Sequence, residues 1–340
     1  MLLNLLRRIF ISTPHRYIKT STLQSQPDRH SLTIPLVGPE EENACLPLVI
    51  NVVSKYWGEE LSPEAEHIAK KYTGIKGSFI IEGIELAEKH GLKGYAYRGS
   101  LDDIRKRIDQ GIPVIVILPG IRETIQHANI ISGYDPDEGR ILTYVPKPET
   151  VGAIPETRFQ KDWEQDDMVS IVLIPQDMKQ IVEKENPRFK ESNRICLEVE
   201  RIRHEGKMAE ALEKISDAVK LDNKNAQAWC IKGSILNEQN SQEAVTSYQE
   251  SIRSNPCYYL AFRGLGNYYL KSKDFHNAEL FYSKAIGINP LRFGPIYKNR
   301  AIARMELGDK VGCRNDLLKY LEQVPNAADL LSIQEALNQF

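Results

Sequence analysis

The sequence predicts two domains of different fold class, an α+β domain followed by an all-α superhelix built from repeated helix pairs. Two observations support this prediction. In the first half of the chain, apolar residues at helical spacing come first and short apolar strands follow, whereas beyond about residue 190 every apolar run has helical spacing. In the second half, small residues recur every 33 or 34 positions. A chain of 340 residues is long enough to give each domain its own core.

Composition restricts the classes of partner. The 44 basic and 46 acidic residues leave a net charge of −2, which disfavours nucleic acid because binding a polyanion needs a positive field. No apolar run is long enough to predict an integral membrane span. The five cysteines form no CxxC pair and the histidines lack ligand spacing, so we expect no metal site and no cofactor. A protein or peptide partner is therefore expected, and the oligomeric state stays open.

Residues 1–30 are interpreted as a disordered or targeting leader. They contain Arg7, Arg8, Arg16 and Lys19 but no acidic residue before Asp28. Such an acid-poor, arginine-bearing segment is typical of a floppy tail, a mitochondrial transit peptide or a peripheral membrane anchor, and these alternatives stay open. We otherwise expect a cytoplasmic protein.

The first domain is expected over residues 31–175. The expected helices are Cys45–Tyr56 and Pro63–Tyr72, and the expected strands are Pro113–Leu118, His127–Gly133, Ile141–Tyr144 and Met168–Ile174. The segment from Asp135 to Gly139 has the residues of a hairpin loop, so the two strands that flank it should pair antiparallel. Residues 176–192 are mostly polar and include Pro187, which predicts a linker.

Residues 193–340 are expected to form about four repeats of a helix pair. The repeating small residues are Ala211, Ala244, Ala278 and Gly312, at separations of 33, 34 and 34. The best copy has Gly266, Tyr269, Ala278, Tyr282 and Pro290, and it closely resembles the tetratricopeptide repeat. That resemblance implies a curved array whose concave surface binds peptides or protein surfaces. The polar first-helix residues that could face a ligand are Lys232, Asn267, Lys271, Asn299 and Arg300.

Cys45 is expected at the start of the first helix, because Asn43 can cap that helix and Pro47 suits its first turn. The positive end of a helix lowers the pKa of a thiol, and a nearby imidazole lowers it further. His127 begins a strand expected in the middle of the sheet and is the natural partner. The alternatives are a buried cysteine at a helix start and a hydrogen-bonded core histidine, and both stay open.

This arrangement resembles the C39-like cysteine peptidases, which are papain-like folds with a helix-start cysteine and a histidine on a sheet strand. The resemblance spans residues 31–175. The segments that carry it are Asn43-Ala44-Cys45-Leu46-Pro47, Tyr56-Trp57-Gly58 and the run from His127 through Gly133-Tyr134-Asp135. It implies an α+β papain-like domain in which Cys45 is the nucleophile and His127 is the base.

Three departures from the family pattern bear on activity. Pro39 and Glu40 occupy the region where the family has an oxyanion-stabilising glutamine. Val145-Pro146 stands where an Asp-Pro pair would orient the imidazole, and Leu46 replaces a glycine after the nucleophile. The catalytic set is therefore incomplete.

Three hypotheses about function follow from these residues, and the third is a purely structural adaptor whose first domain only packs against the repeats. In the first, the protein is a cysteine peptidase or acyl-transfer enzyme that acts through Cys45 and His127, with the repeats presenting a protein substrate. In the second, it is a catalytically inactive scaffold that binds a peptide or protein through the degenerate cleft and the groove of the repeats. The missing glutamine and aspartate favour the second hypothesis, and the family resemblance favours the first.

Overall fold

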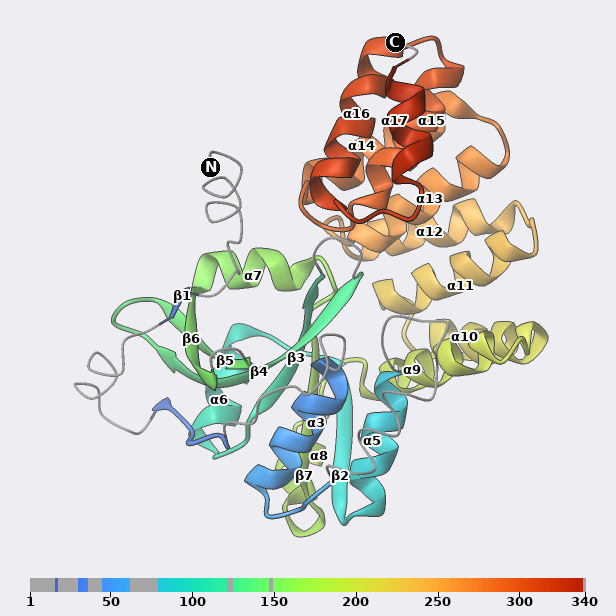
Figure 1. Ribbon diagram of the computed structural model, residues 1–340. Coiled ribbons are helices and arrows are strands. Elements are labelled where there is room, and N and C mark those ends of the chain that lie inside the picture. The colour runs from blue at the N-terminus through green and yellow to red at the C-terminus, as the bar shows by residue number, and fades with distance from the viewer. Residues whose placement is uncertain are drawn as a thin grey trace.

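The computed structural model describes residues 16–17, 30–35, 45–61, 79–120, 125–146 and 149–338. Figure 1 shows a sheet with helices around it, from which an arm of helix pairs leads to the C-terminus. This is the predicted α+β domain followed by a helical superhelix. The predicted helix Pro63–Tyr72 and most of the predicted leader lie outside the described residues.

The sheet has seven antiparallel strands in the order β1-β6-β5-β4-β3-β7-β2. The strands are β1 (Arg16–Tyr17), β2 (Leu92–Arg98), β3 (Val114–Pro119), β4 (Gln126–Asp135), β5 (Arg140–Pro146), β6 (Glu149–Pro155) and β7 (Val169–Pro175). The four strands expected from the sequence are β3, β4, β5 and β7, each within two residues of its predicted ends. β4 and β5 form the expected antiparallel hairpin.

The sequence indicates a helix stop at Gly91 to Gly94 before a strand but gives no bounds for β2, which carries a glycine and two basic residues. Packing explains Gly94: a Cβ at this position would lie 2.5 Å from Cγ2 of Ile84 on helix α5 (Ile80–Lys89). β2 pairs with β7 over its whole length, so tertiary contacts outweigh its weak strand propensity.

Helices cover both faces of the sheet. On one face, α3 (Cys45–Tyr56) and α5 contribute to an apolar cluster that includes Ile117 and Ala128. On the other face, α6 (Leu101–Asp109) and α7 (Glu156–Glu164) pack in a second cluster with Leu118 and Ile131. Successive strand residues point to opposite faces, so each strand divides its side chains between the two clusters.

The contacts of its last turn fix the direction of α3. The Tyr56 hydroxyl donates to the Gly111 carbonyl at 2.9 Å, and the indole of Trp57, just past the helix, donates to the Leu173 carbonyl at 2.7 Å. Gly111 precedes β3, and Leu173 lies near the end of β7. Twelve helical residues span about 18 Å. The start of α3 therefore lies toward the opposite end of the sheet, where β3 ends and β4 and β7 begin.

The polar segment after β7 is folded onto the first domain. It contains a 3-10 turn, Gln176–Met178, and the short helix α8 (Lys179–Glu183). Val182 is completely buried in the second apolar cluster. The Glu185 carboxylate accepts a hydrogen bond from the buried Arg107 guanidinium at 2.7 Å. A few anchors thus hold a stretch whose sequence is mostly polar.

The rest of the chain forms four helix pairs and one further helix. The pairs are α9 (Lys190–His204) with α10 (Met208–Leu221), α11 (Ala226–Glu238) with α12 (Glu243–Ser254), α13 (Tyr259–Lys271) with α14 (Phe275–Ile288), and α15 (Pro295–Glu306) with α16 (Lys310–Gln323); α17 (Leu330–Leu337) follows. The predicted pattern of small and aromatic residues packs these helices. A Cβ on Gly266 of α13 would lie 2.5 Å from the Tyr282 ring of α14.

The contact between Gly266 and Tyr282 gives a testable prediction. Gly266→Ala places a methyl group inside the Tyr282 ring contact, and overpacking of this kind costs about 1–3 kcal/mol of unfolding free energy. Gly287→Ala is the matched control, because Gly287 is an exposed helical glycine at which an added Cβ would have nothing within 4 Å. This control should be neutral or slightly stabilising. Urea unfolding followed by circular dichroism measures both; equal stability of the two variants would contradict the packing.

Candidate functional site

A buried arginine joins the two domains. Arg292, in the turn between α14 and α15, pairs through Nη2 with Oδ1 of Asp166 at 2.7 Å, and neither side chain is exposed to solvent (0% each). Its Nε donates to the Ile125 carbonyl at 3.2 Å and its Nη1 to the Gln165 carbonyl at 3.4 Å. One guanidinium thus binds one carboxylate oxygen and two backbone carbonyls of the first domain, while Oδ2 of Asp166 has no partner among the described residues.

Two asparagines extend this contact. Asn255 donates to the Glu164 carbonyl at 2.8 Å and to Oδ1 of Asp167 at 3.0 Å. Asn289 lies one 34-residue repeat later and donates to Oε1 of Gln165 at 3.0 Å. The contacts of Asp166, Asp167, Asn255, Asn289 and Arg292 are called the domain contact below. They hold turns of successive repeats against a single loop of the sheet domain.

The loop that supplies the carboxylates is conformationally constrained. Asp167 and Met168 both have left-handed backbone angles, with φ of 55° and 53°, which side chains with a Cβ seldom adopt. Burial raises the pKa of Asp166 and raises the pKa of Asp167 to about 6, although Arg98 lies 3.3 Å from Asp167 and opposes the shift. Keeping both carboxylates charged therefore depends on their partners.

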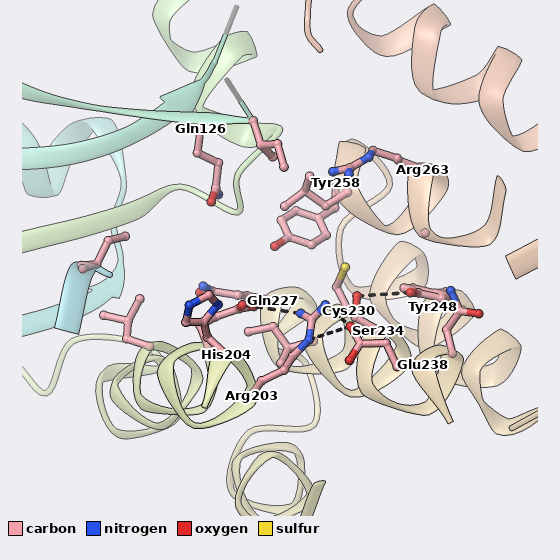
Figure 2. A pocket seen from close by; sticks show the side chains of 18 of the residues that line it. Gln126, Arg203, His204, Gln227, Cys230, Ser234, Glu238, Tyr248, Tyr258 and Arg263 are labelled. Atoms are coloured by element: carbon pink, nitrogen blue, oxygen red, sulfur yellow. Dashed lines mark hydrogen bonds and ion pairs between the residues drawn. The ribbon is translucent and has the colours of Figure 1, made fainter. Parts of the chain in front are cut away.

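A cleft of about 790 Å³ lies beside the domain contact, between the two domains (Figure 2). One wall comes from the ends of β3, β4 and β7 that lie together, and from the start of α5. The other wall comes from α9, α11 and α13, the first helices of three successive pairs. The polar lining residues are Gln126, Glu200, Arg203, His204, Gln227, Ser234, Asn237, Glu238, Tyr248, Tyr258, Arg263 and Asn267.

The cleft contains two arginines, and its two glutamates both lie beside the first of them, Arg203. The Arg203 guanidinium is 2.9 Å from Oε1 of Glu238 through its Nε and 3.5 Å from Glu200 through its Nη1. Burial raises the pKa of the Glu200 carboxyl. The cleft also contains a second guanidinium, that of Arg263, from the first helix of the third pair (Figure 2).

Cys45 is the first residue of α3, as predicted, although its side chain lies outside the description. The start of α3 is directed toward the end of the sheet where Ile117, Gln126 and Val169 line the cleft. The predicted nucleophile therefore begins a helix whose positive end points toward the cleft.

His127 lies half-buried on β4, directly opposite Leu118 of β3. Directly opposite residues of an antiparallel pair share a face, and Leu118 packs in the cluster with α6 and α7. The helix α3 packs on the other face, with Ala128 and the Gln126 side of β4. This register does not bring His127 to the face of α3, so its partnership with Cys45 remains a prediction.

Val145, which departs from the family pattern, and Asp135, which belongs to the matching segment, both have structural roles. Val145 is buried on β5 and pairs with Thr150. Asp135, at the end of β4, accepts the backbone N–H groups of Asp137 and Glu138 at 3.0 and 3.1 Å and so stabilises the hairpin turn. Pro39 and Glu40 lie outside the described residues.

The five polar residues expected on the ligand face are dispersed. Asn267 lines the cleft and accepts a hydrogen bond from Tyr282 at 2.8 Å. Lys271 is exposed and donates to the Asn237 carbonyl, Lys232 lies over the Trp229 ring, and Asn299 is half-buried on α15. Arg300 is bound by both oxygens of Asp316, at 2.8 and 2.6 Å. Its charge is thus used in packing α15 against α16.

Sequence reasoning does not single out Gln126, Arg203, Tyr258 or Arg263, which all line the cleft. Three of them come from the repeats and one comes from the sheet. The domain contact is the feature that indicates that they line the same cleft. The sequence pattern alone gives no indication of that contact, because its members are turn residues up to 126 positions apart.

Metal-binding side chains do not gather in the part of the chain that the structure describes. No group of three or more His, Cys, Asp or Glu side chains is placed there to bind a metal ion. Cys196, Cys230 and Cys313 are buried free thiols, Cys257 is an exposed one, and burial raises the pKa of Cys230 to about 12. Among the same described residues, no helix has the length and apolar character needed to cross a membrane.

Comparison with protein families identifies both parts of the chain. Residues 20–171 match the Peptidase_C39 like family, and residues 264–290 match the tetratricopeptide repeat. The chain carries a C39-like domain followed by tetratricopeptide repeats. The predicted resemblances are thus confirmed in their order along the chain. The sheet of the C39-like domain and the helical C-terminal region agree with the α+β and all-α classes expected.

Solved structures resemble the repeat region. A thermophilic tetratricopeptide-repeat protein of Thermus thermophilus is 19% identical over 46% of this chain and 85% of its own, with a TM-score of 0.38. MamA is 25% identical over 43% of this chain and 84% of its own, with a TM-score of 0.36. PilF of Pseudomonas aeruginosa is 14% identical over 40% and 62%, with a TM-score of 0.38. No curated protein matches the sequence.

Proposed function

We propose that this protein binds an extended peptide segment of a partner in the cleft between its C39-like domain and its repeats. The single observation that carries the proposal is that both domains build the walls of one cleft of about 790 Å³. The buried domain contact holds these walls in one arrangement. A preformed cleft lowers the ordering cost of binding, which favours capture of a flexible segment.

The polar groups of the cleft suit a polypeptide backbone. Oε1 of Gln227 and Oδ1 of Asn237 are buried and have no hydrogen-bond partner within the described part of the chain. A backbone N–H of a bound peptide would satisfy either oxygen, and leaving a buried acceptor without a donor costs about 1–3 kcal/mol. Ile231 and Leu260 also line the cleft and offer apolar surface to side chains.

Binding in this cleft does not need the catalytic set of the family. The wall residues come mainly from α9, α11 and α13 of the repeats, and the family positions for the glutamine and the aspartate hold other residues. In this function the C39-like domain acts as a wall that narrows the groove of the repeats. Removal of the Cys45 thiol would then leave binding intact.

Peptide selection tests this function directly. We expect a displayed random peptide library to yield peptides that bind the full chain. Ser234→Trp should weaken their affinity at least tenfold, because the indole would occupy space inside the cleft. Gln227→Leu should weaken them without adding bulk. Ser272→Trp, on the exposed end of α13, is the matched control and should bind normally. Anisotropy titrations measure the affinities, and thermal unfolding checks each fold.

Two results would overturn peptide binding in the cleft. One is a selection that yields no binder to the folded wild-type chain. The other is a set of binders with unchanged affinity for both Ser234→Trp and Gln227→Leu.

A second candidate function is thiol-dependent cleavage or acyl transfer. The observation that favours it is the direction of α3, whose positive end points toward the cleft end of the sheet. In this function the Cys45 thiolate attacks a peptide carbonyl, the amine leaves with a proton, and water releases the acyl group from the thioester. The family resemblance assigns these proton transfers to His127, although the register of β3 and β4 places that residue on the face of β4 away from α3.

Alkylation of the thiols tests this second function. We expect iodoacetamide to modify Cys45 with an apparent pKa well below the ordinary value of about 8.5, and His127→Ala to raise that pKa. The exposed thiol of Cys257 is an internal control in the same protein. Peptide mass spectrometry across pH 5 to 9 resolves the two sites. A Cys45 that reacts no faster than Cys257 at pH 6 would exclude the activated thiolate.

A further inference from the structure

Arg263 is the exceptional charge of the cleft. Of the two arginines that line it, Arg203 is paired with Glu238 and approached by Glu200. Arg263 forms no ion pair and no hydrogen bond within the part of the chain that the structure describes, and Figure 2 shows its guanidinium above the Tyr258 ring at the cleft. The cleft thus has one guanidinium whose five donors have no acceptor among these residues.

The surroundings of Arg263 hold the side chain in place without neutralising it. Its Cζ lies 4.3 Å from the centre of the Phe293 ring, a cation–π contact. Arg292 lies in the same region, but Asp166 compensates its charge. Burial, together with the nearby Arg292, lowers the pKa of Arg263, although a guanidinium with so high an intrinsic pKa stays charged at neutral pH.

A half-buried positive charge without a carboxylate is costly, and a carboxylate from a ligand would remove that cost. The planar fork of a guanidinium matches the two oxygens of a carboxylate in a bidentate pair. The neighbouring acids cannot supply it, because Glu238 and Glu200 both face Arg203.

The position of Arg263 along α13 indicates which part of a bound peptide supplies the carboxylate, a side chain or the C-terminus. Leu260 lies one turn before it and Asn267 one turn after it, and both line the cleft. A bound chain that follows these residues passes Arg263 in its middle, so its terminus does not lie there. We infer that Arg263 receives the side-chain carboxylate of an aspartate or glutamate in the bound peptide. This inference rests on the proposed peptide-binding function and makes the ligand an acidic segment.

The test uses the full chain and peptide pools with a blocked N-terminus and an amidated C-terminus. Each pool fixes one position as Glu or as Gln and leaves the other positions random. We expect one position at which the Glu pool binds about tenfold or more tightly than the Gln pool, as for a charge-assisted pair. Arg263→Gln should abolish this preference, so that the Glu and Gln pools bind to that variant with equal affinity. Arg263→Lys should retain part of the preference.

The controls separate this inference from the proposed function. Arg253→Gln removes an exposed arginine of α12 and should keep the full preference. Equal binding of the Glu and Gln pools, or a preference that survives Arg263→Gln, would overturn the inference that Arg263 binds an acidic side chain. Binding of peptides in the cleft would still be established. A second set of pools with a free C-terminal carboxylate is measured alongside; an Arg263-dependent preference seen only with that set would overturn the inference in favour of a chain terminus. Failure of every pool to bind would overturn both proposals.

Discussion

The buried ion pair between Arg292 and Asp166 holds the later repeats against the sheet domain, to which α9 is joined by Leu197 in the first apolar cluster and by the pairs Arg194–Glu88 and Arg201–Glu85. Two buried charges need hydrogen-bond partners. Arg292 binds a carboxylate oxygen and two carbonyls, and Oδ1 of Asp166 accepts from both Arg292 and Gln126, whereas Oδ2 of Asp166 is buried without a partner among the described residues. Removing one partner of such a pair costs about 3–5 kcal/mol, because the other charge stays buried. The two domains therefore meet in one geometry, and that geometry gives the cleft its second wall.

Contacts inside each domain determine which of its helices and strand ends face this cleft. In the repeats, close contacts such as that of Gly266 with the Tyr282 ring bring each second helix against its first helix and leave the first helices on the concave side. In the C39-like domain, Tyr56 and Trp57 anchor the last turn of α3 at the far end of the sheet. The start of that helix is consequently directed toward the end of the sheet where β3, β4 and β7 contribute to the cleft.

The sequence predicts those parts of the fold that local pattern determines. The helix at Cys45–Tyr56 and the hairpin around Asp135 follow from apolar spacing and turn residues, and the repeats follow from their period. The cleft could not be predicted, because Arg292 and Asp166 resemble ordinary turn residues until a distant loop buries them. Arg300 illustrates the same limit: its place on a first helix predicts a ligand-facing residue, yet a buried Asp316 on the next helix binds it.

Small-angle X-ray scattering of the full chain with Arg292→Met tests the domain contact most directly. The wild-type chain should scatter as a single arrangement of the two domains. Arg292→Met should increase the radius of gyration and broaden the distance distribution, because Asp166 loses its partner and the repeats are released from the loop. Arg253→Met, which removes an exposed arginine of the same repeat region, should match the wild type. Identical profiles for Arg292→Met and the wild type would contradict a cleft held by this ion pair.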